Sequence, residues 1–148
     1  GVAAGIVMGI VSDVAARSRI FRSSMFVVDG TFLLRALGCR GDPGAVYRAG
    51  VPMHLATSGI FGAVYTVATA LAGLQTLSIP LTALYVSLLW LSMLFVALPT
   101  AGQGFLGSRA GRSTWLEQLV LHVVFFVVYY GMLRVIYDTL PVFSQAIR

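Results

Sequence analysis

Two histidines carry the most distinctive possible chemistry in this sequence. His54 and His122 stand inside long apolar segments. His54 is about one helical turn, and His122 about two turns, from segment ends that we predict to lie on the same side of a membrane. Two imidazoles that enter from one leaflet are the minimum for axial ligation of a haem or related tetrapyrrole. The helical rise, however, places them at depths that differ by roughly 5 Å. Cofactor binding by His54 and His122 is one hypothesis. The alternative that we favour is an interhelical hydrogen bond for His122 and an interfacial position for His54.

Asp13 is an ionisable residue within an otherwise apolar run, and Arg17 follows it one turn later. A carboxylate in hydrocarbon costs several kcal/mol unless it is paired or faces water. Residues four apart lie on one helix face, so Arg17 can pair with Asp13. The pair is either a structural ion pair near the membrane edge, which we favour, or a proton or cation site. Glu117 stands in the first turn of another predicted helix, where the helix dipole favours an acid.

The sequence predicts no metal site and no catalytic centre. Glu117 and His122 are five residues apart, about 140° around a helix, so they do not share a face for chelation. Cys39 is the only cysteine and therefore builds neither an intrachain disulfide nor a thiolate cluster. The sequence has no phosphate-binding loop, dinucleotide fingerprint, zinc-protease motif or nucleophile elbow. We therefore expect a protein that is not an enzyme.

Small residues at spacings of three and four predict close contact between two helices. The first set lies in residues 1–16 and the second in residues 51–73, and their principal members are Gly1, Gly5, Gly9, Gly59, Ala63 and Gly73. Small side chains allow helix backbones to approach closely in a membrane, where dispersion contacts accumulate. We expect these two segments to touch.

The elements that position these residues are membrane helices. Of 148 residues, 58% are hydrophobic and only 10% charged, whereas soluble domains carry about 25% charged residues. About 20 apolar residues cross a bilayer as a helix. The predicted architecture is an all-α integral membrane protein that forms a single helical domain over residues 1–148. Its four predicted spans are residues 1–16, 51–73, 77–98 and 115–137.

Residues 23–37 are apolar but too short to span, and Asp29 and Gly30 interrupt them. We expect a short interfacial or re-entrant helix, with a serine cap at its start and Gly38 at its end. Residues 38–50 are predicted to be loop, with Pro52 in the first turn of the following span. The four-residue turn 74–77 makes the second and third spans antiparallel neighbours.

Arginine gives the predicted orientation. The chain has a net charge of +5, all ten basic residues are arginine, and eight of them fall in the loops 17–50 and 99–114. The positive-inside rule places these loops in the cytoplasm and both termini outside, in a plasma membrane that is the inner membrane if the source is bacterial. Nucleic-acid binding is not expected, because no folded soluble element carries a basic face.

The leading hypothesis for function is a non-catalytic accessory or structural subunit that packs against other transmembrane subunits of a larger complex. Small loops and glycine-rich helix faces favour this role. One alternative is a self-associating transporter, or an ion or proton channel, that uses Asp13, Glu117 and His122. The other is a haem- or pigment-binding membrane subunit. Under each of these hypotheses the protein is expected to contact the lipid bilayer and either other transmembrane subunits or further copies of itself.

Overall fold

The computed structural model describes residues 1–139, which form α-helices joined by loops and contain no strand. The predicted all-helical class is therefore confirmed. In chain order the elements are α1 (Val2–Arg17), α2 (Met25–Ala36), α3 (Pro43–Leu71), α4 (Ile79–Ser92), the π-helix η1 (Met93–Ala97), α5 (Leu98–Thr100), the 3-10 turn η2 (Phe105–Gly107) and α6 (Thr114–Thr139).

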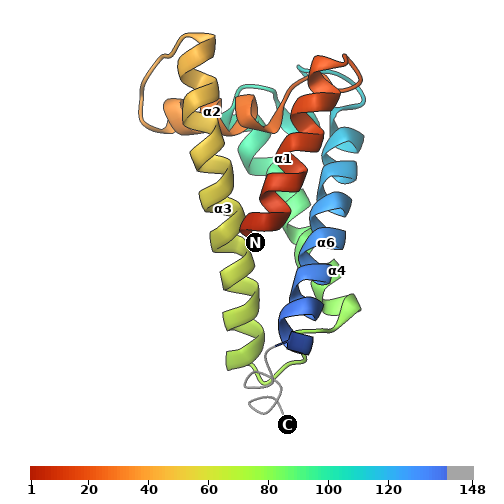
Figure 1. The fold of residues 1–148 in the computed structure, drawn as a ribbon. Coiled ribbons are helices and arrows are strands. Elements are labelled where there is room, and N and C mark those ends of the chain that lie inside the picture. Colours follow the sequence, from red (N-terminus) through yellow and green to blue (C-terminus); the bar gives the residue numbers. More distant parts are fainter. Residues whose placement is uncertain (140–148) are drawn as a thin grey trace.

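Three helices in the described part of the chain are long and apolar enough to cross a membrane. They are α3, the continuous helical stretch Ile79–Thr100 and α6. The predicted count of four spans is not confirmed, because α1 has only 16 residues. Gly1, which immediately precedes α1, lies beside Ser58 and Gly62 near the middle of α3, so α1 runs along part of the bundle's length (Figure 1).

α3 begins earlier than the sequence indicated, so the prediction of a loop over residues 38–50 is wrong from residue 43 onward. The Asp42 carboxylate accepts a hydrogen bond from the Ala45 amide at 2.9 Å, and Pro43 occupies the first turn. Both residues are strong helix-start signals. Pro52 consequently lies well inside α3 rather than in its first turn. The serine cap of α2 (Ser24) and the left-handed Gly38 after it are as predicted.

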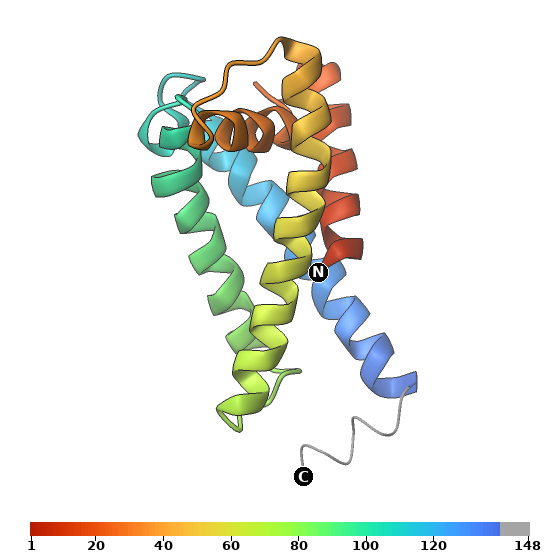
Figure 2. The ribbon, with the colours of Figure 1, turned by 90° about the vertical axis from the view of Figure 1, so that its left-hand side faces the viewer.

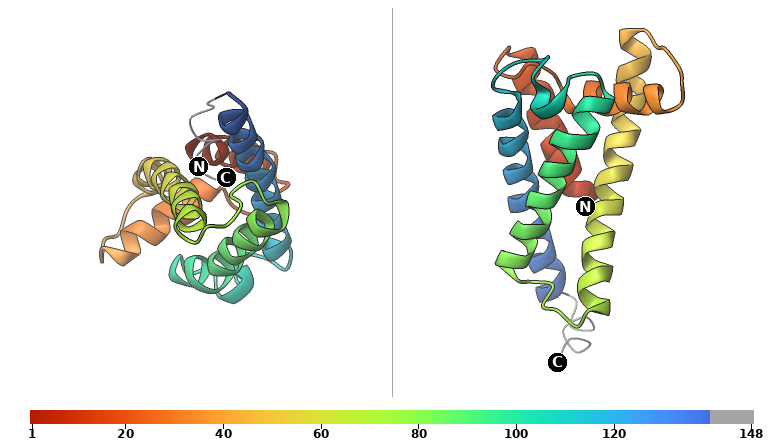
Figure 3. Two further views of the ribbon diagram at one scale, coloured as in Figure 1. Left: turned by 90° about the horizontal axis from the view of Figure 1, so that it is seen from below. Right: turned by 180° about the vertical axis from the view of Figure 1, so that it is seen from behind.

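Four helical segments, α1, α3, α4 with its continuation to Thr100, and α6, form an incomplete ring around the bundle axis. α1 packs between α3 and α6, and α4 packs on the other side of α6. α3 and α4 are antiparallel and are joined near their connecting turn, where the Tyr65 hydroxyl lies 2.7 Å from Thr82 Oγ1. From that turn they diverge, and α2 lies across the wide end (Figures 2 and 3).

Glycines set the close contacts between several of these helices. A Cβ on Gly30 of α2 would overlap the Val46 carbonyl oxygen, and a Cβ on Gly50 of α3 would overlap the Phe26 carbonyl oxygen. α1 contacts α3 as the small-residue spacing predicts, with Gly5 against Ser58 and Gly1 against Gly62.

Two predicted members of the α3 contact face lie elsewhere. Ala63 is exposed, because it is one residue and about 100° around the helix from Gly62. Gly73 follows the end of α3 with a φ of +63° and ends the helix there. Gly59 lies beside Val2, and Gly9 lies against the ring of Phe26.

Candidate functional site

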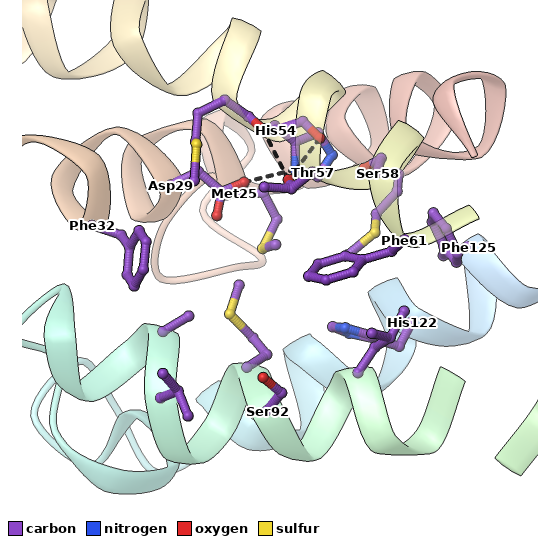
Figure 4. Close-up of a pocket in the computed structure, with 16 residues that line it drawn as sticks. Met25, Asp29, Phe32, His54, Thr57, Ser58, Phe61, Ser92, His122 and Phe125 are labelled. Carbon is purple, nitrogen blue, oxygen red and sulfur yellow. Dashed lines mark hydrogen bonds and ion pairs between the residues drawn. The ribbon is translucent and has the colours of Figure 1, made fainter. Parts of the chain in front are cut away.

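A cavity of about 180 Å³ lies where α3 and α4 diverge, and we call it the α3–α4 cavity. Residues of α1, α2, α3, α4, η1 and α6 line it (Figure 4). α2 contributes Met25, Asp29 and Phe32 where it crosses the wide end of the bundle. The cavity is thus a direct consequence of two helices that meet at one end and separate at the other.

The wall formed by the α4 segment contains a π-helical turn. Ser92, Met93, Val96 and Ala97 line the cavity, and the last three belong to η1. A π-turn inserts an extra residue into a helix and rotates the following side chains, and such turns occur frequently at functional sites. Here the turn is at the cavity, which marks this region as the candidate site.

One polar wall is a hydrogen-bonded pair of titratable side chains. His54 Nδ1 lies 2.7 Å from Asp29 Oδ2, and His54 Nε2 lies 3.0 Å from the carbonyl oxygen of Gly5. A carbonyl only accepts, so Nε2 carries a proton, and one further proton is shared between Nδ1 and the carboxyl group. Wherever that proton resides, the pair has no net charge. It joins α1, α2 and α3 in a largely buried position.

His122 of α6 faces the cavity from the opposite side (Figure 4). Its Nδ1 lies 2.8 Å from the Gln118 carbonyl oxygen, so this nitrogen donates and carries the ring proton. Burial among apolar side chains favours the uncharged ring. Nε2 is then an acceptor, and no hydrogen bond from the described residues reaches it.

The cavity does not fit a tetrapyrrole held by the two histidines. Both nitrogens of His54 already have partners, and they would have to be released for axial ligation. Pockets that bind drug-sized ligands have volumes of roughly 300–1,000 Å³, more than this cavity offers. Aromatic side chains on the same helix as His122 could line such a ring, but Tyr129 and Tyr130 already donate hydrogen bonds to the carbonyls of Gly62 and Leu77.

The acidic residues proposed for ion conduction are not brought together with His122. Arg17 Nε lies 2.7 Å from Asp13 Oδ2, so these two form an ion pair near the end of α1. Glu117 accepts hydrogen bonds from the Arg22 amide at 2.9 Å and the Ser113 hydroxyl at 2.7 Å. Neither acid lines the α3–α4 cavity. The contacts of Glu117 fasten the α1–α2 connection to the start of α6.

Sequence reasoning missed two features of this site. Asp29 looked like an interruption of an interfacial helix, although a carboxylate in an apolar stretch is itself a signal for a buried partner. Four of the chain's five methionines line the cavity: Met8, Met25, Met53 and Met93. Their positions share no spacing, because they come from different elements, so only the fold brings them together.

The described residues contain no group of three or more His, Cys, Asp or Glu side chains that could hold a metal ion. The site is therefore a largely apolar cavity with a neutral His–Asp pair on one wall and an imidazole acceptor on the other. No protein-family model, curated protein or solved structure matches this chain.

Proposed function

We propose that this is a polytopic membrane protein that binds one small lipid-soluble molecule in the α3–α4 cavity. The observation that carries the proposal is where the cavity opens. Phe61 on α3 and Val96 on η1 both line it, and these side chains are 41% and 54% exposed. The mouth is thus between two candidate membrane spans, and not at a water-facing end of the bundle.

The depth of the mouth supports a ligand that arrives through lipid. Phe61 is near the middle of the apolar stretch 51–73, so the opening faces hydrocarbon when α3 crosses the bilayer. A solute that is insoluble in hydrocarbon has no direct access there. The lining is mainly apolar with few polar groups, which is the usual composition of small-molecule sites.

The membrane arrangement that accompanies this proposal has α1 as a fourth embedded helix beside three complete spans. The segments 17–50 and 99–114, which hold eight of the ten arginines, are at the end of the bundle where α2 lies (Figure 1). By the positive-inside rule this end is cytoplasmic. The cavity is then in the cytoplasmic half of the membrane, beneath α2.

We also propose an accessory role in a larger membrane complex, which is compatible with ligand binding. The spans present many apolar side chains outward, as contact with other transmembrane helices requires. Copurification of another membrane protein at a fixed ratio from native membranes tests this role. A partner-free monomer in mild detergent contradicts it.

The binding proposal is tested by filling the cavity. Ala97 lines it, so the larger side chain of Ala97→Phe is expected to occupy part of the space for a ligand. Val127→Phe is the matched control, since Val127 lies on α6, is 60% exposed and does not line the cavity. Both variants are purified in mild detergent beside the wild type, and lipophilic small molecules are extracted and quantified by mass spectrometry.

We expect the wild type and Val127→Phe to carry the same small molecule at close to one per chain, and Ala97→Phe to have lost it. Circular dichroism and gel filtration establish that all three proteins are folded. Equal amounts of every extracted species in the three proteins, or no retained species in any of them, would show that the proposal is wrong.

A further inference from the structure

We infer that the ligand enters the α3–α4 cavity with a hydroxyl-bearing aromatic ring, as in a phenol or quinol with an apolar tail. The ring hydroxyl donates a hydrogen bond to Nε2 of His122, and the tail leaves between α3 and α4 into the bilayer. This inference rests on the proposed function and specifies its ligand class.

The volume selects a single ring. An apolar protein cavity of about 150 Å³ accommodates one benzene molecule. The α3–α4 cavity, at about 180 Å³, is large enough for a six-membered ring with one or two oxygen substituents and too small for a fused multi-ring system. A long tail must therefore lie outside, and the mouth beside Phe61 and Val96 gives it a path to hydrocarbon.

The lining suits an aromatic ring. The four methionines bring polarizable thioethers, which make favourable contacts with aromatic edges and adapt to irregular shapes. Phe32, Phe61 and Phe125 add three aromatic side chains from three different helices. Aromatic pairs in offset or edge-to-face arrangements contribute about 0.5–1.5 kcal/mol beyond their buried area.

The wall opposite the His54–Asp29 pair has an acceptor without a hydrogen bond, and this acceptor favours a ligand that donates one; the hydroxyls of Ser58 and Ser92 also line the cavity and can donate or accept. On the opposite wall, Asp29 and His54 satisfy each other, and His54 also bonds to Gly5. The Thr57 hydroxyl donates within its own helix, to the carbonyls of Met53 and His54. His122 Nε2 is different, because Nδ1 holds the ring proton and leaves Nε2 as an acceptor. A phenolic hydroxyl supplies the missing proton donor, whereas a hydrocarbon or an ether does not.

A soft metal ion is the competing ligand for thioethers and imidazole. The position of the mouth argues against it, because an ion would have to reach the cavity through hydrocarbon. The cavity wall also lacks an unpaired carboxylate to balance an ionic charge, since Asp29 is already hydrogen-bonded to His54.

The test compares decylhydroquinone with decylbenzene, which has the same tail and ring without hydroxyl groups. Wild-type protein in lipid nanodiscs is titrated with each probe under anaerobic, reducing conditions, and binding is measured by native mass spectrometry. We expect decylhydroquinone to bind about tenfold more tightly, the equivalent of one well-made hydrogen bond. His122→Leu should remove this preference and retain binding of decylbenzene. Val127→Phe should behave as the wild type.

A second measurement uses the wild type alone and does not depend on a variant that folds. In protein labelled with ¹⁵N-histidine, the unprotonated Nε2 resonance of His122 should move on addition of decylhydroquinone and stay in place with decylbenzene. Equal binding of the two probes overturns the hydroxyl inference and leaves the apolar binding site. Binding of neither probe overturns the inferred ligand class, and the proposed function falls with it only if the wild type also retains no small molecule that Ala97→Phe lacks. Saturable binding of silver ion alone, with neither organic probe, replaces both with a soft-metal site.

Discussion

At the scale of single residues, the pair formed by Asp29 and His54 is the polar contact whose loss we expect to reduce stability most. It links α1, α2 and α3 through hydrogen bonds of 2.7 and 3.0 Å in an apolar region. Replacing Asp29→Leu leaves Nδ1 of His54 buried without a partner. We expect a loss of about 2–3 kcal/mol in the free energy of unfolding, measured by titration with SDS in mixed micelles.

The matched variants separate a lost partner from a lost side chain. Asp29→Asn keeps an amide that donates to Nδ1 of neutral His54, so it should lose only about 1 kcal/mol. The double variant Asp29→Leu with His54→Leu should be more stable than the sum of the two single losses, because no orphaned polar atom remains at that contact. Full additivity would contradict direct coupling.

Asp42 gives the protein a pH-dependent helix start. The amides of Ala45 and Gly44 hydrogen-bond to its carboxylate and hold the pKa of Asp42 below its ordinary value of 3.8. A depressed folded-state pKa means that the carboxylate stabilises the fold fully above the ordinary value and loses this effect as the pH falls through the lower folded value. The melting temperature should therefore fall on acidification.

Asp42→Asn isolates this contribution, because asparagine caps helices about as well as aspartate and does not titrate. We expect the melting temperature of the wild type, relative to Asp42→Asn, to be constant near neutral pH and to decline between about pH 5 and pH 3. The check is a pair of thermal denaturation series in one detergent. A difference that does not change over this range would contradict the role of the carboxylate.

Residue types in the sequence predicted local pairs better than distant ones. Asp13 and Arg17 are four apart on one helix, so helical geometry alone brings them to 2.7 Å. Asp29 and His54 are 25 residues apart, and Arg22 and Glu117 are 95 apart. Those contacts depend on how α2 turns back over α3 and how the chain returns at α6, which a single sequence does not specify.

At the scale of elements, the contact between α2 and α3 depends on two glycines. Gly30 and Gly50 face each other's backbone, and any Cβ there overlaps a carbonyl oxygen of the opposite helix. Gly30→Ala and Gly50→Ala should each lower the free energy of unfolding by about 2 kcal/mol or more, since helix backbones cannot yield as a flexible side chain would. Unfolding in SDS mixed micelles measures it.

Gly131 in α6 is the control for this prediction, because a Cβ there meets no atom within 4 Å. Gly131→Ala should leave stability unchanged or raise it by up to about 1 kcal/mol, the difference in helix propensity. If the three variants behave alike, then backbone contact between α2 and α3 is not what requires glycine at positions 30 and 50.

Helix existence was predictable from apolar length, but helix extent was not. The long runs gave α3, the α4 segment and α6 to within a few residues at most ends. The first turns of α3 were missed because Gly44 and Gly50 resemble loop residues, while the Asp42–Pro43 start signal favours a helix. The π-turn at Met93–Ala97 has no pattern in the sequence that distinguishes it from ordinary helix.

At the scale of the whole molecule, the α3–α4 cavity follows from the angle between two helices. Hydrogen bonds of Tyr65 to Thr76 and Thr82 hold α3 and α4 together beside their short turn. The turn correctly predicted an antiparallel pair, but the divergence away from it depends on α2 at the wide end (Figure 2). The cavity was therefore not predictable from the sequence.

The orientation of the protein in the membrane can be tested with a cysteine that the chain already contains. Cys39 is exposed at the arginine-rich end, and Gln75 is exposed in the turn at the opposite end. A membrane-impermeant maleimide applied to intact cells stripped of any outer envelope should not modify Cys39 until the membrane is permeabilised. In a Cys39→Ser background, Gln75→Cys should be modified at once. The reverse pattern inverts the orientation and moves the cavity to the outer half of the bilayer. Equal labelling of both positions means that α3 does not cross, and the path for a lipid-soluble ligand between α3 and α4 disappears with it.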